Sequence, residues 1–377
     1  MHEIDRILES TRRITAAGEA AVLATVVDTS GSTLRHSGAR LLIRASGETV
    51  GFVSAGCVEK DLAEHAAEVL RSGTPKVLTY SADALDDTVT GFGLGCRGTL
   101  RLLLERLPGP TTERVLAEIA AGRRQRCSLL LATILAACEG EGRVSRATLS
   151  EAGRFWSDLE DRRVENQVRE HLVALSSPGQ AEKIAVGIPG MEVLVERLSP
   201  PPALVIVGAG ATAASLAQVA SSLGWVVTVA DHRSPAGGDL PLPEDVVPLV
   251  CPPEEMVDRT SPDARTAVVL LTHNLVSDQV LVPGFLASPA FYVGLLASRG
   301  RGERLLAEIE AEGRALSAAE LARLFTPVGL DLGAETAEEL ALAVASEILA
   351  VQRGRQGGCL KNRGKPAHAS PRFAALC

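Results

Sequence analysis

The sequence predicts an α/β protein in which an α+β domain is followed by a domain built on a doubly wound parallel sheet. Two observations carry this prediction. A strand–glycine turn–helix–strand pattern occupies residues 204–233, and further short apolar strands and helices follow it. A run of three prolines at 200–202 is typical of a linker. We therefore predict one domain at 1–199, a second at 203–352, and a basic tail at 353–377 that we expect to be disordered.

Composition narrows the class of protein before any motif is considered. The 377 residues are 46% hydrophobic but only 3% aromatic, with a formal net charge of −8, so nothing indicates a nucleic-acid-binding face. The polar first residues are not a signal peptide, and no apolar run is long enough to span a membrane. Seven cysteines without CxxC spacing fit a reduced, cytoplasmic protein better than a disulfide framework or a zinc site.

The first domain mixes both kinds of element. We expect helices where apolar residues recur every three to four positions, and strands where short apolar or alternating runs end in turn residues. The expected helices cover 2–17, 57–72, 112–123 and 157–174. The expected strands cover 20–27, 39–43, 49–53, 76–80, 99–105, 128–137 and 191–197.

The second domain opens with a dinucleotide-binding fingerprint. An apolar strand at 204–207 runs into Gly208-Ala209-Gly210-Ala211-Thr212-Ala213, a helix at 213–223 follows, and a strand at 225–230 delivers Asp231. The first glycine permits the tight turn, and the second lets backbone approach a pyrophosphate at the helix N-terminus. With strands also expected at 267–271 and 290–295 and a helix at 336–351, this pattern predicts a Rossmann-like domain.

Ligands of such sheets bind beyond the carboxyl ends of the strands, and this rule selects the candidate residues of the second domain. Asp231 is placed to accept hydrogen bonds from a ribose, and Arg233 to meet a phosphate. His273 follows the third strand and lies on the same expected rim. The alternatives are an exposed carboxylate at a strand end for Asp231 and a hydrogen-bonded histidine at a sheet edge for His273.

Two cysteines of the first domain stand apart from the other five. Cys57 follows Gly56 at the start of an expected helix, where a thiolate is favoured, although Glu59 in the first turn opposes that bias. Cys96 follows Gly95 in a glycine-dense loop. Thiolates are ligands for soft metals, but a buried, inert cysteine is the commoner alternative.

A third candidate in the first domain is the turn at Gly31 and Ser32, followed by Arg35. Backbone N–H groups and a guanidinium in this arrangement are able to cradle an anion. The alternative is a solvated hairpin turn with no ligand.

An ordered set of motifs resembles the XdhC/CoxI family. The resemblance covers nearly the whole chain, apart from the middle of the first domain and the tail. The motifs are GSTLRHSGA (31–39), GFVSAGCVEK (51–60), GLGCRGTL (93–100), LVIVGAGATA (204–213), VTVADHR (227–233), LLTHNLVSD (270–278), FYVGLLASR (291–299) and TPVGLDLGAETAEELALAV (326–344).

The resemblance implies a function as an accessory protein of molybdenum hydroxylases such as xanthine dehydrogenase, aldehyde oxidoreductase and CO dehydrogenase. Such a chaperone binds the molybdenum cofactor, as molybdopterin or its cytosine dinucleotide, protects it during sulfuration and delivers it to the apo-enzyme. The implied partners are that hydroxylase and a cysteine desulfurase. We also expect a homodimer, because a carrier has to shield a labile ligand and the first domain is poor in aromatic residues. The chief rival is an NAD(P)-dependent oxidoreductase with His273 as its acid–base group, and NAD(P) or another nucleotide in the Rossmann crevice is compatible with either function.

The expected cofactor site combines all the residues singled out above. Cys57 and Cys96 are its expected metal ligands, with Arg97 beside Cys96 suited to a pterin phosphate. The sequence departs from many relatives in two places, at Ala211, where they have histidine, and at Cys96-Arg97-Gly98, where they have Cys-Gly-Gly. The expected binding residues are Gly31, Ser32, Arg35, Gly56, Cys57, Glu59, Gly95, Cys96, Arg97, Gly208, Gly210, Asp231, Arg233 and His273.

Overall fold

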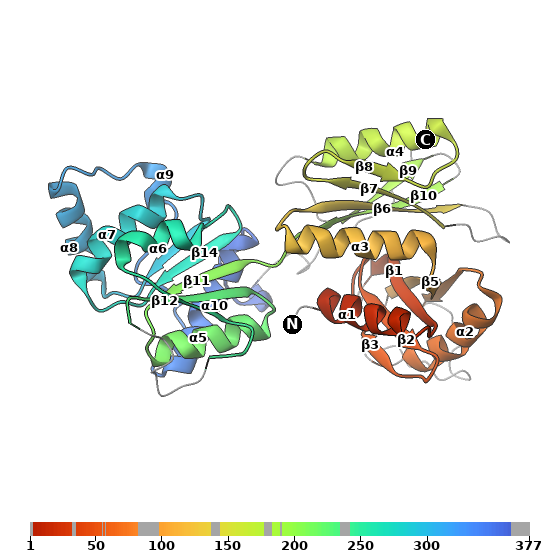
Figure 1. Cartoon of the computed structure of the whole chain (residues 1–377), viewed down its shortest axis with the longest axis horizontal. Coiled ribbons are helices and arrows are strands. Elements are labelled where there is room, and N and C mark those ends of the chain that lie inside the picture. Colours follow the sequence, from red (N-terminus) through yellow and green to blue (C-terminus); the bar gives the residue numbers. More distant parts are fainter. Residues whose placement is uncertain are drawn as a thin grey trace. The chain divides into compact units, whose positions relative to one another are not determined.

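The computed structural model describes most of the chain, which divides into two compact units between Pro200 and Pro201 (Figure 1). We call them the N-terminal unit and the C-terminal unit. Among the described residues, none of the helices combines the length and apolar character needed to cross a membrane. The described residues are 3–31, 35–54, 56, 58–81, 98–136, 144–176, 183–188, 191–233 and 242–362.

The N-terminal unit contains two five-stranded antiparallel sheets. Sheet A has the strand order β3-β2-β1-β5-β4, and sheet B has the order β8-β7-β6-β10-β9. The elements are α1 (Glu3–Ala16), β1 (Ala21–Gly31), β2 (Arg40–Arg44), β3 (Thr49–Gly51), α2 (Glu59–Ser72), β4 (Lys76–Ser81), β5 (Gly98–Leu107), α3 (Pro110–Arg124), β6 (Leu129–Ala136), β7 (Val144–Ser150), β8 (Phe155–Ser157), α4 (Arg162–Leu175), β9 (Lys183–Ile188) and β10 (Met191–Leu198).

Each sheet of this unit has two apolar faces. One face of sheet A packs on α2 through a cluster that includes Leu62 and Leu102, and one face of sheet B packs on α4 through a cluster that includes Leu172 and Val193. The other faces share a core with α1 and α3. Figure 1 shows the result, with α2 and α4 on the outer faces of the two sheets. The strands are therefore covered on both sides, which explains their nearly continuous apolar sequences.

The C-terminal unit is a six-stranded sheet in the order β13-β12-β11-β14-β15-β16, with all its pairs parallel. Helices α5 and α10 cover one face, whereas α6, α7 and α8 cover the other. The predicted fold class is thereby confirmed. The elements are β11 (Ala203–Val207), α5 (Ala211–Ser222), β12 (Val226–Asp231), β13 (Val247–Val250), α6 (Pro253–Thr260), β14 (Thr266–Leu270), α7 (Leu275–Ala287), β15 (Tyr292–Leu295), α8 (Arg299–Ala311), α9 (Ala318–Leu321), β16 (Leu324–Phe325), α10 (Ala337–Gln352) and the short 3-10 helix η2 (Leu360–Asn362).

Candidate functional site

The glycine turn of the C-terminal unit has the geometry that the fingerprint predicts. Gly208 has φ of 113°, and a Cβ at this position would lie 3.1 Å from the carbonyl oxygen of Leu271. Gly210 caps α5 without any side-chain hydrogen bond, and nothing lies within 4 Å of where its Cβ would be. Space and N–H groups at the start of α5 thus remain for an anionic ligand, so this turn fits a phosphate or pyrophosphate.

Asp231 is engaged by the same turn. Its side chain is only 3% exposed, and its two oxygens accept hydrogen bonds from the backbone N–H groups of Ala209 at 2.9 Å and Arg233 at 2.8 Å. The carboxylate therefore fixes the glycine turn to the end of β12. A carboxylate has further acceptor sites, so this role is compatible with a ribose contact.

Two basic side chains flank Asp231 at the end of β12. The side chains of His232 and Arg233 are 57% and 74% exposed, with His232 Nδ1 3.1 Å and Arg233 Nε 3.4 Å from Asp231 Oδ1. The exposed Arg233 guanidinium places a positive group at this end of the rim, which favours a ligand that carries negative charge.

The rim continues at the end of β14. Strands β12, β11 and β14 are neighbours, so Asp231, Gly208 and the exposed His273 follow adjacent parallel strands at one edge. Next to His273, Asp278 is fully buried in the first turns of α7, where it accepts from the Thr272 hydroxyl.

Asp278 is a rim residue that sequence reasoning did not single out. Burial raises its pKa, against the hydrogen bond from Thr272 and the charges of Arg301 and His273. Arg301 lies 2.5 Å from it and also donates to the Thr272 carbonyl. The signal in the sequence was the THNLVSD segment after β14, where a carboxylate one turn into a helix follows a capping asparagine.

The N-terminal unit gathers its predicted segments at one end of sheet A, which we call the loop end. Gly31, the last residue of β1, pairs with Gly98, the first of β5, and Ser81 at the end of β4 pairs with Thr99. Helix α2 begins at this same end, because Tyr80 donates a 2.5 Å hydrogen bond to Asp61 in its first turn. The connections that follow Gly31, Gly51 and Ser81 therefore all start at this end of the sheet.

Glu59 shapes the loop before α2. Its carboxylate accepts hydrogen bonds from the backbone N–H of Ser54 at 2.9 Å and from the Ser54 hydroxyl. Burial acts to raise the pKa of Glu59, but the hydrogen bonds from Ser54 outweigh it and hold the pKa below its ordinary value. Positive φ at Gly56, 104°, completes this turn. Glu59 thus holds the loop as Asp231 holds the glycine turn.

Arg35 is already paired. Its guanidinium lies 2.6 Å from a carboxylate oxygen of Glu3 and 4.2 Å from the centre of the Phe52 ring. The carboxylate of Glu3 offsets the charge that we expected to attract an anion. An anion at Arg35 would therefore compete with Glu3 for the guanidinium.

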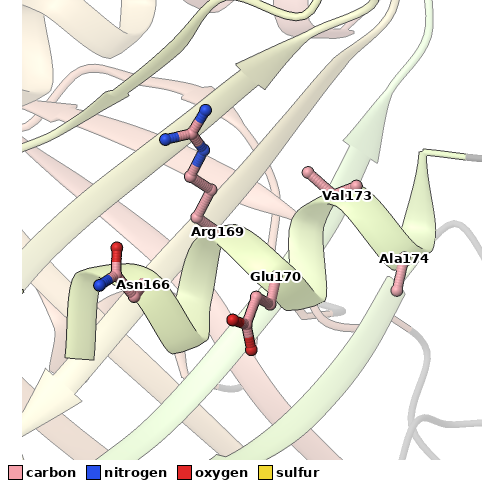
Figure 2. A pocket seen from close by; sticks show the side chains of 5 residues that line it. All are labelled: Asn166, Arg169, Glu170, Val173 and Ala174. Atoms are coloured by element: carbon pink, nitrogen blue, oxygen red, sulfur yellow. The ribbon is translucent and has the colours of Figure 1, made fainter. Parts of the chain in front are cut away.

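The remaining expected residues, Ser32, Cys57, Gly95, Cys96 and Arg97, lie outside the described residues. Within the described part of the chain there is no group of three or more His, Cys, Asp or Glu side chains able to hold a metal ion. A surface hollow along α4, shown in Figure 2, is lined by none of the predicted residues. Its lining residues are Asn166, Arg169, Glu170, Val173 and Ala174.

Two family models match the chain, one in each unit. The model described as the XdhC and CoxI family matches residues 14–81, and the model described as the XdhC Rossmann domain matches residues 204–348. The chain belongs to the XdhC and CoxI family. The resemblance that the sequence motifs carried is thereby confirmed.

Two relatives match this chain over most of their own length. The chain is 27% identical over 341 residues to a protein of Bacillus subtilis described as a probable xanthine dehydrogenase subunit, covering 89% of this chain and 94% of the relative. It is 26% identical over 336 residues to the molybdenum cofactor insertion chaperone PaoD of Escherichia coli, covering 89% and 85%.

A solved structure has the same fold. It is the crystal structure of a protein from Bacillus halodurans described as a xanthine dehydrogenase. The TM-score is 0.75 at 24% identity, covering 94% of this chain and 97% of that one. The fold of that protein therefore extends over both units of this chain.

Proposed function

We propose that this protein binds the molybdenum cofactor, protects it during sulfuration and delivers it to an apo molybdenum hydroxylase of the xanthine dehydrogenase class. The observation that carries the proposal is the match of both units to XdhC family models, together with the likeness to a molybdenum cofactor insertion chaperone. The partner is then the apo-hydroxylase, with a cysteine desulfurase as a second partner during sulfuration.

The C-terminal unit supports the proposal through its phosphate-binding geometry. Molybdopterin carries a phosphate and its dinucleotide a pyrophosphate, and either group suits the uncapped start of α5 beside Gly208 and Gly210. Asp231 holds the turn in place, and Arg233 lies at the same strand end. A separate nucleotide such as NAD(P) would use the same groups.

The N-terminal unit would hold the metal-bearing part of the cofactor. The connections whose sequences contain Cys57 and Cys96 follow strands that end at the loop end, and a thiolate suits a metal that is already bound by sulfur. Arg97 would meet a pterin phosphate, and Glu59 keeps the loop before α2 in shape. Once inserted into a hydroxylase, the cofactor supplies the metal centre for that enzyme's chemistry, so the present chain needs no turnover of its own.

The experiment is metal and pterin analysis of the protein purified without oxygen from a cofactor-producing host. We expect the wild-type chain and the control Cys127→Ser to retain molybdenum and pterin, and Cys57→Ser to lose most of the metal. The loaded protein should activate an apo-hydroxylase. Absence of pterin from the wild type, or hydride transfer between NAD(P) and a small alcohol or aldehyde, would overturn the proposal.

A further inference from the structure

The two halves of the N-terminal unit have the same order of elements. The first half runs α1-β1-β2-β3-α2-β4-β5, and the second runs α3-β6-β7-β8-α4-β9-β10. The spatial order of the strands is also the same. When the five strands of each half are numbered along the chain, both sheets have the order 3-2-1-5-4. Such agreement in both sequence order and spatial order indicates two versions of one module.

The pairing registers make the equivalence residue by residue. The central threonine of each first strand pairs with an arginine on one side and a leucine on the other. The strands around them are alike in sequence, with LATV at 23–26 against LATI at 131–134, and LLLERL at 102–107 against VLVERL at 193–198. The paired sets are Thr25 with Arg40 and Leu103, and Thr133 with Arg146 and Leu194.

The first helices and their exits agree as well. Gly18 follows α1 with φ of 68°, and Arg126 follows α3 with φ of 53°. Positive φ is uncommon for a residue other than glycine, so its recurrence at the equivalent position is informative. The next residue in each half donates its backbone N–H into the preceding helix, from Glu19 to Ile14 at 3.0 Å and from Cys127 to Gly122 at 2.8 Å.

The contacts between the halves are reciprocal. Arg40 of the first half pairs with Glu196 of the second at 2.8 Å, and Arg146 of the second half pairs with Glu105 of the first at 2.5 Å. All four side chains are less than 10% exposed. Because Arg40 is equivalent to Arg146 and Glu105 to Glu196, each half makes the same contact with the other. This is the pattern of a two-fold interface, in which one patch meets its own equivalent.

Residues at the same place in the two halves also meet each other across this interface. Arg101 on β5 and Glu192 on β10 each lie two residues before the leucine of the paired set and form a 2.8 Å ion pair, although a bulge in β1 pairs Arg101 with Asp28 whereas Glu192 pairs with Leu135. In a dimer of identical chains a residue on the axis meets its own copy, so like charges would face each other. The apolar cluster beside them also contains equivalent pairs, Val27 with Leu135 and Leu103 with Leu194.

The halves differ in the connections at one end. Strand β4 ends at 81 and β5 begins at 98, whereas β9 ends at 188 and β10 begins at 191. The connection between the third strand and the helix is also longer in the first half, running from 51 to 59 against 157 to 162. Both extended connections belong to the loop end of sheet A. The corresponding end of sheet B has instead Asp161 as the side-chain cap of α4, with Asp158 and Glu160 beside it.

We propose that residues 3–107 and 110–198 are two copies of one module, packed through the interface of a two-fold dimer, and that only the first copy binds the cofactor. The second copy acts as a permanent partner that covers the inner face of the first. The two longer connections of the first copy, which follow Gly51 and Ser81, both start at its loop end, whereas the equivalent connections of the second copy are short. The assignment of the ligand rests on the proposed function, whereas the duplication does not.

The duplication is tested with the same substitution at equivalent positions. Glu105→Gln and Glu196→Gln each leave a buried arginine without its carboxylate, and we expect each to lower the thermal midpoint by roughly 5–10 °C. The two shifts in thermal midpoint should agree within about 2 °C, because the two ion pairs have equivalent surroundings. For two unrelated ion pairs we would expect the shifts to differ by more than this. A large shift for one and none for the other would overturn the two-fold equivalence.

The ligand assignment is tested by exchanging connections. Replacing residues 82–97 by Pro189-Gly190, the two residues that join β9 to β10, should leave the thermal midpoint unchanged and reduce bound pterin and molybdenum at least tenfold. Replacing Pro189-Gly190 by two glycines is the control and should leave loading unchanged. If the exchange prevents folding, Arg97→Ala and Cys96→Ser make the same comparison without a change of length.

The outcomes separate the two proposals. Full loading of the first variant, or loss of loading in the control, places the ligand elsewhere and overturns the assignment to the first copy. A wild-type chain without pterin or molybdenum overturns the proposed function and the ligand assignment with it. In that case the paired glutamine substitutions still decide whether the unit is a duplicated dimer.

Discussion

Replacing Asp231 by alanine should destabilise the C-terminal unit, because the Asp231 carboxylate holds the glycine turn to the end of β12 by hydrogen bonds. The change removes the acceptor for two backbone N–H groups, those of Ala209 and Arg233. Hydrogen bonds to charged groups contribute about 1.5–3 kcal/mol each, and an unpaired buried donor loses a comparable amount. Water reaches the exposed Arg233 more easily than the half-buried Ala209. We therefore expect a loss of about 2–4 kcal/mol in the free energy of unfolding.

The measurement is urea unfolding followed by circular dichroism, with Asp231→Asn as the matched variant. Asparagine keeps one acceptor oxygen, but its amide N–H2 faces a second donor, so an intermediate loss is expected. Asp245→Ala is the control, since it removes an exposed carboxylate that accepts hydrogen bonds from the Ser221 hydroxyl. If Asp231→Ala changes the free energy of unfolding by less than about 0.5 kcal/mol, the structural role of Asp231 is refuted. The carboxylate would then serve only to bind a ligand.

Four further changes probe both units. Gly208→Ala should cost about 1–3 kcal/mol in urea unfolding, because it combines positive φ with a 3.1 Å contact to Leu271; equal stability of variant and wild type would contradict the strained turn. Gly210→Ala should change stability by less than about 0.5 kcal/mol but weaken nucleotide binding in calorimetry, since its Cβ enters open space. Asn274→Ala removes the α7 cap and should cost about 1 kcal/mol, with unaltered unfolding as the contrary result. Glu59→Gln tests a pH effect, because a carboxylate whose pKa is lowered in the folded protein stabilises the fold at pH values above its ordinary pKa of 4.5 and loses that contribution as the pH falls through the folded pKa. The difference in unfolding free energy between variant and wild type should therefore shrink at pH values below the folded pKa. A difference that does not change with pH would contradict this role of Glu59.

The C-terminal unit was predictable because its signals are local. A buried strand, a glycine turn and a helix can each be predicted from a few adjacent residues. Because the strands are parallel neighbours, their carboxyl ends place Gly208, Asp231 and His273 on one rim. The sequence could not reveal that both oxygens of Asp231 are taken by backbone N–H groups. That fact depends on the conformation of the turn after β12, which no spacing rule specifies.

The N-terminal unit was less predictable because its partners are distant in sequence. Strand β7, VSRATLS, carries a central arginine and reads as polar, yet Arg146 is buried there by its ion pair with Glu105. Arg35 likewise resembled a free anion-binding group, although Glu3 neutralises it from a helix 32 residues away. The duplication left a visible trace in the paired LATV/LATI and LLLERL/VLVERL segments, which a search for internal repeats could have found.

The two candidate sites share one design in which carboxylates shape loops and leave backbone groups for the ligand. Asp231 binds N–H groups on either side of the glycine turn, and Glu59 binds the loop before α2. In both places a negative side chain is directed inward and neutralised by donors, so it repels an anionic cofactor less than a free carboxylate would. A chaperone must release its cargo, and binding through backbone N–H groups rather than a dense set of charged side chains keeps affinity moderate. At Arg35, a ligand phosphate that displaces Glu3 would gain a contact with the guanidinium but break an existing ion pair, so the net gain in binding free energy would be small. Arg35 therefore fits the same pattern of moderate affinity.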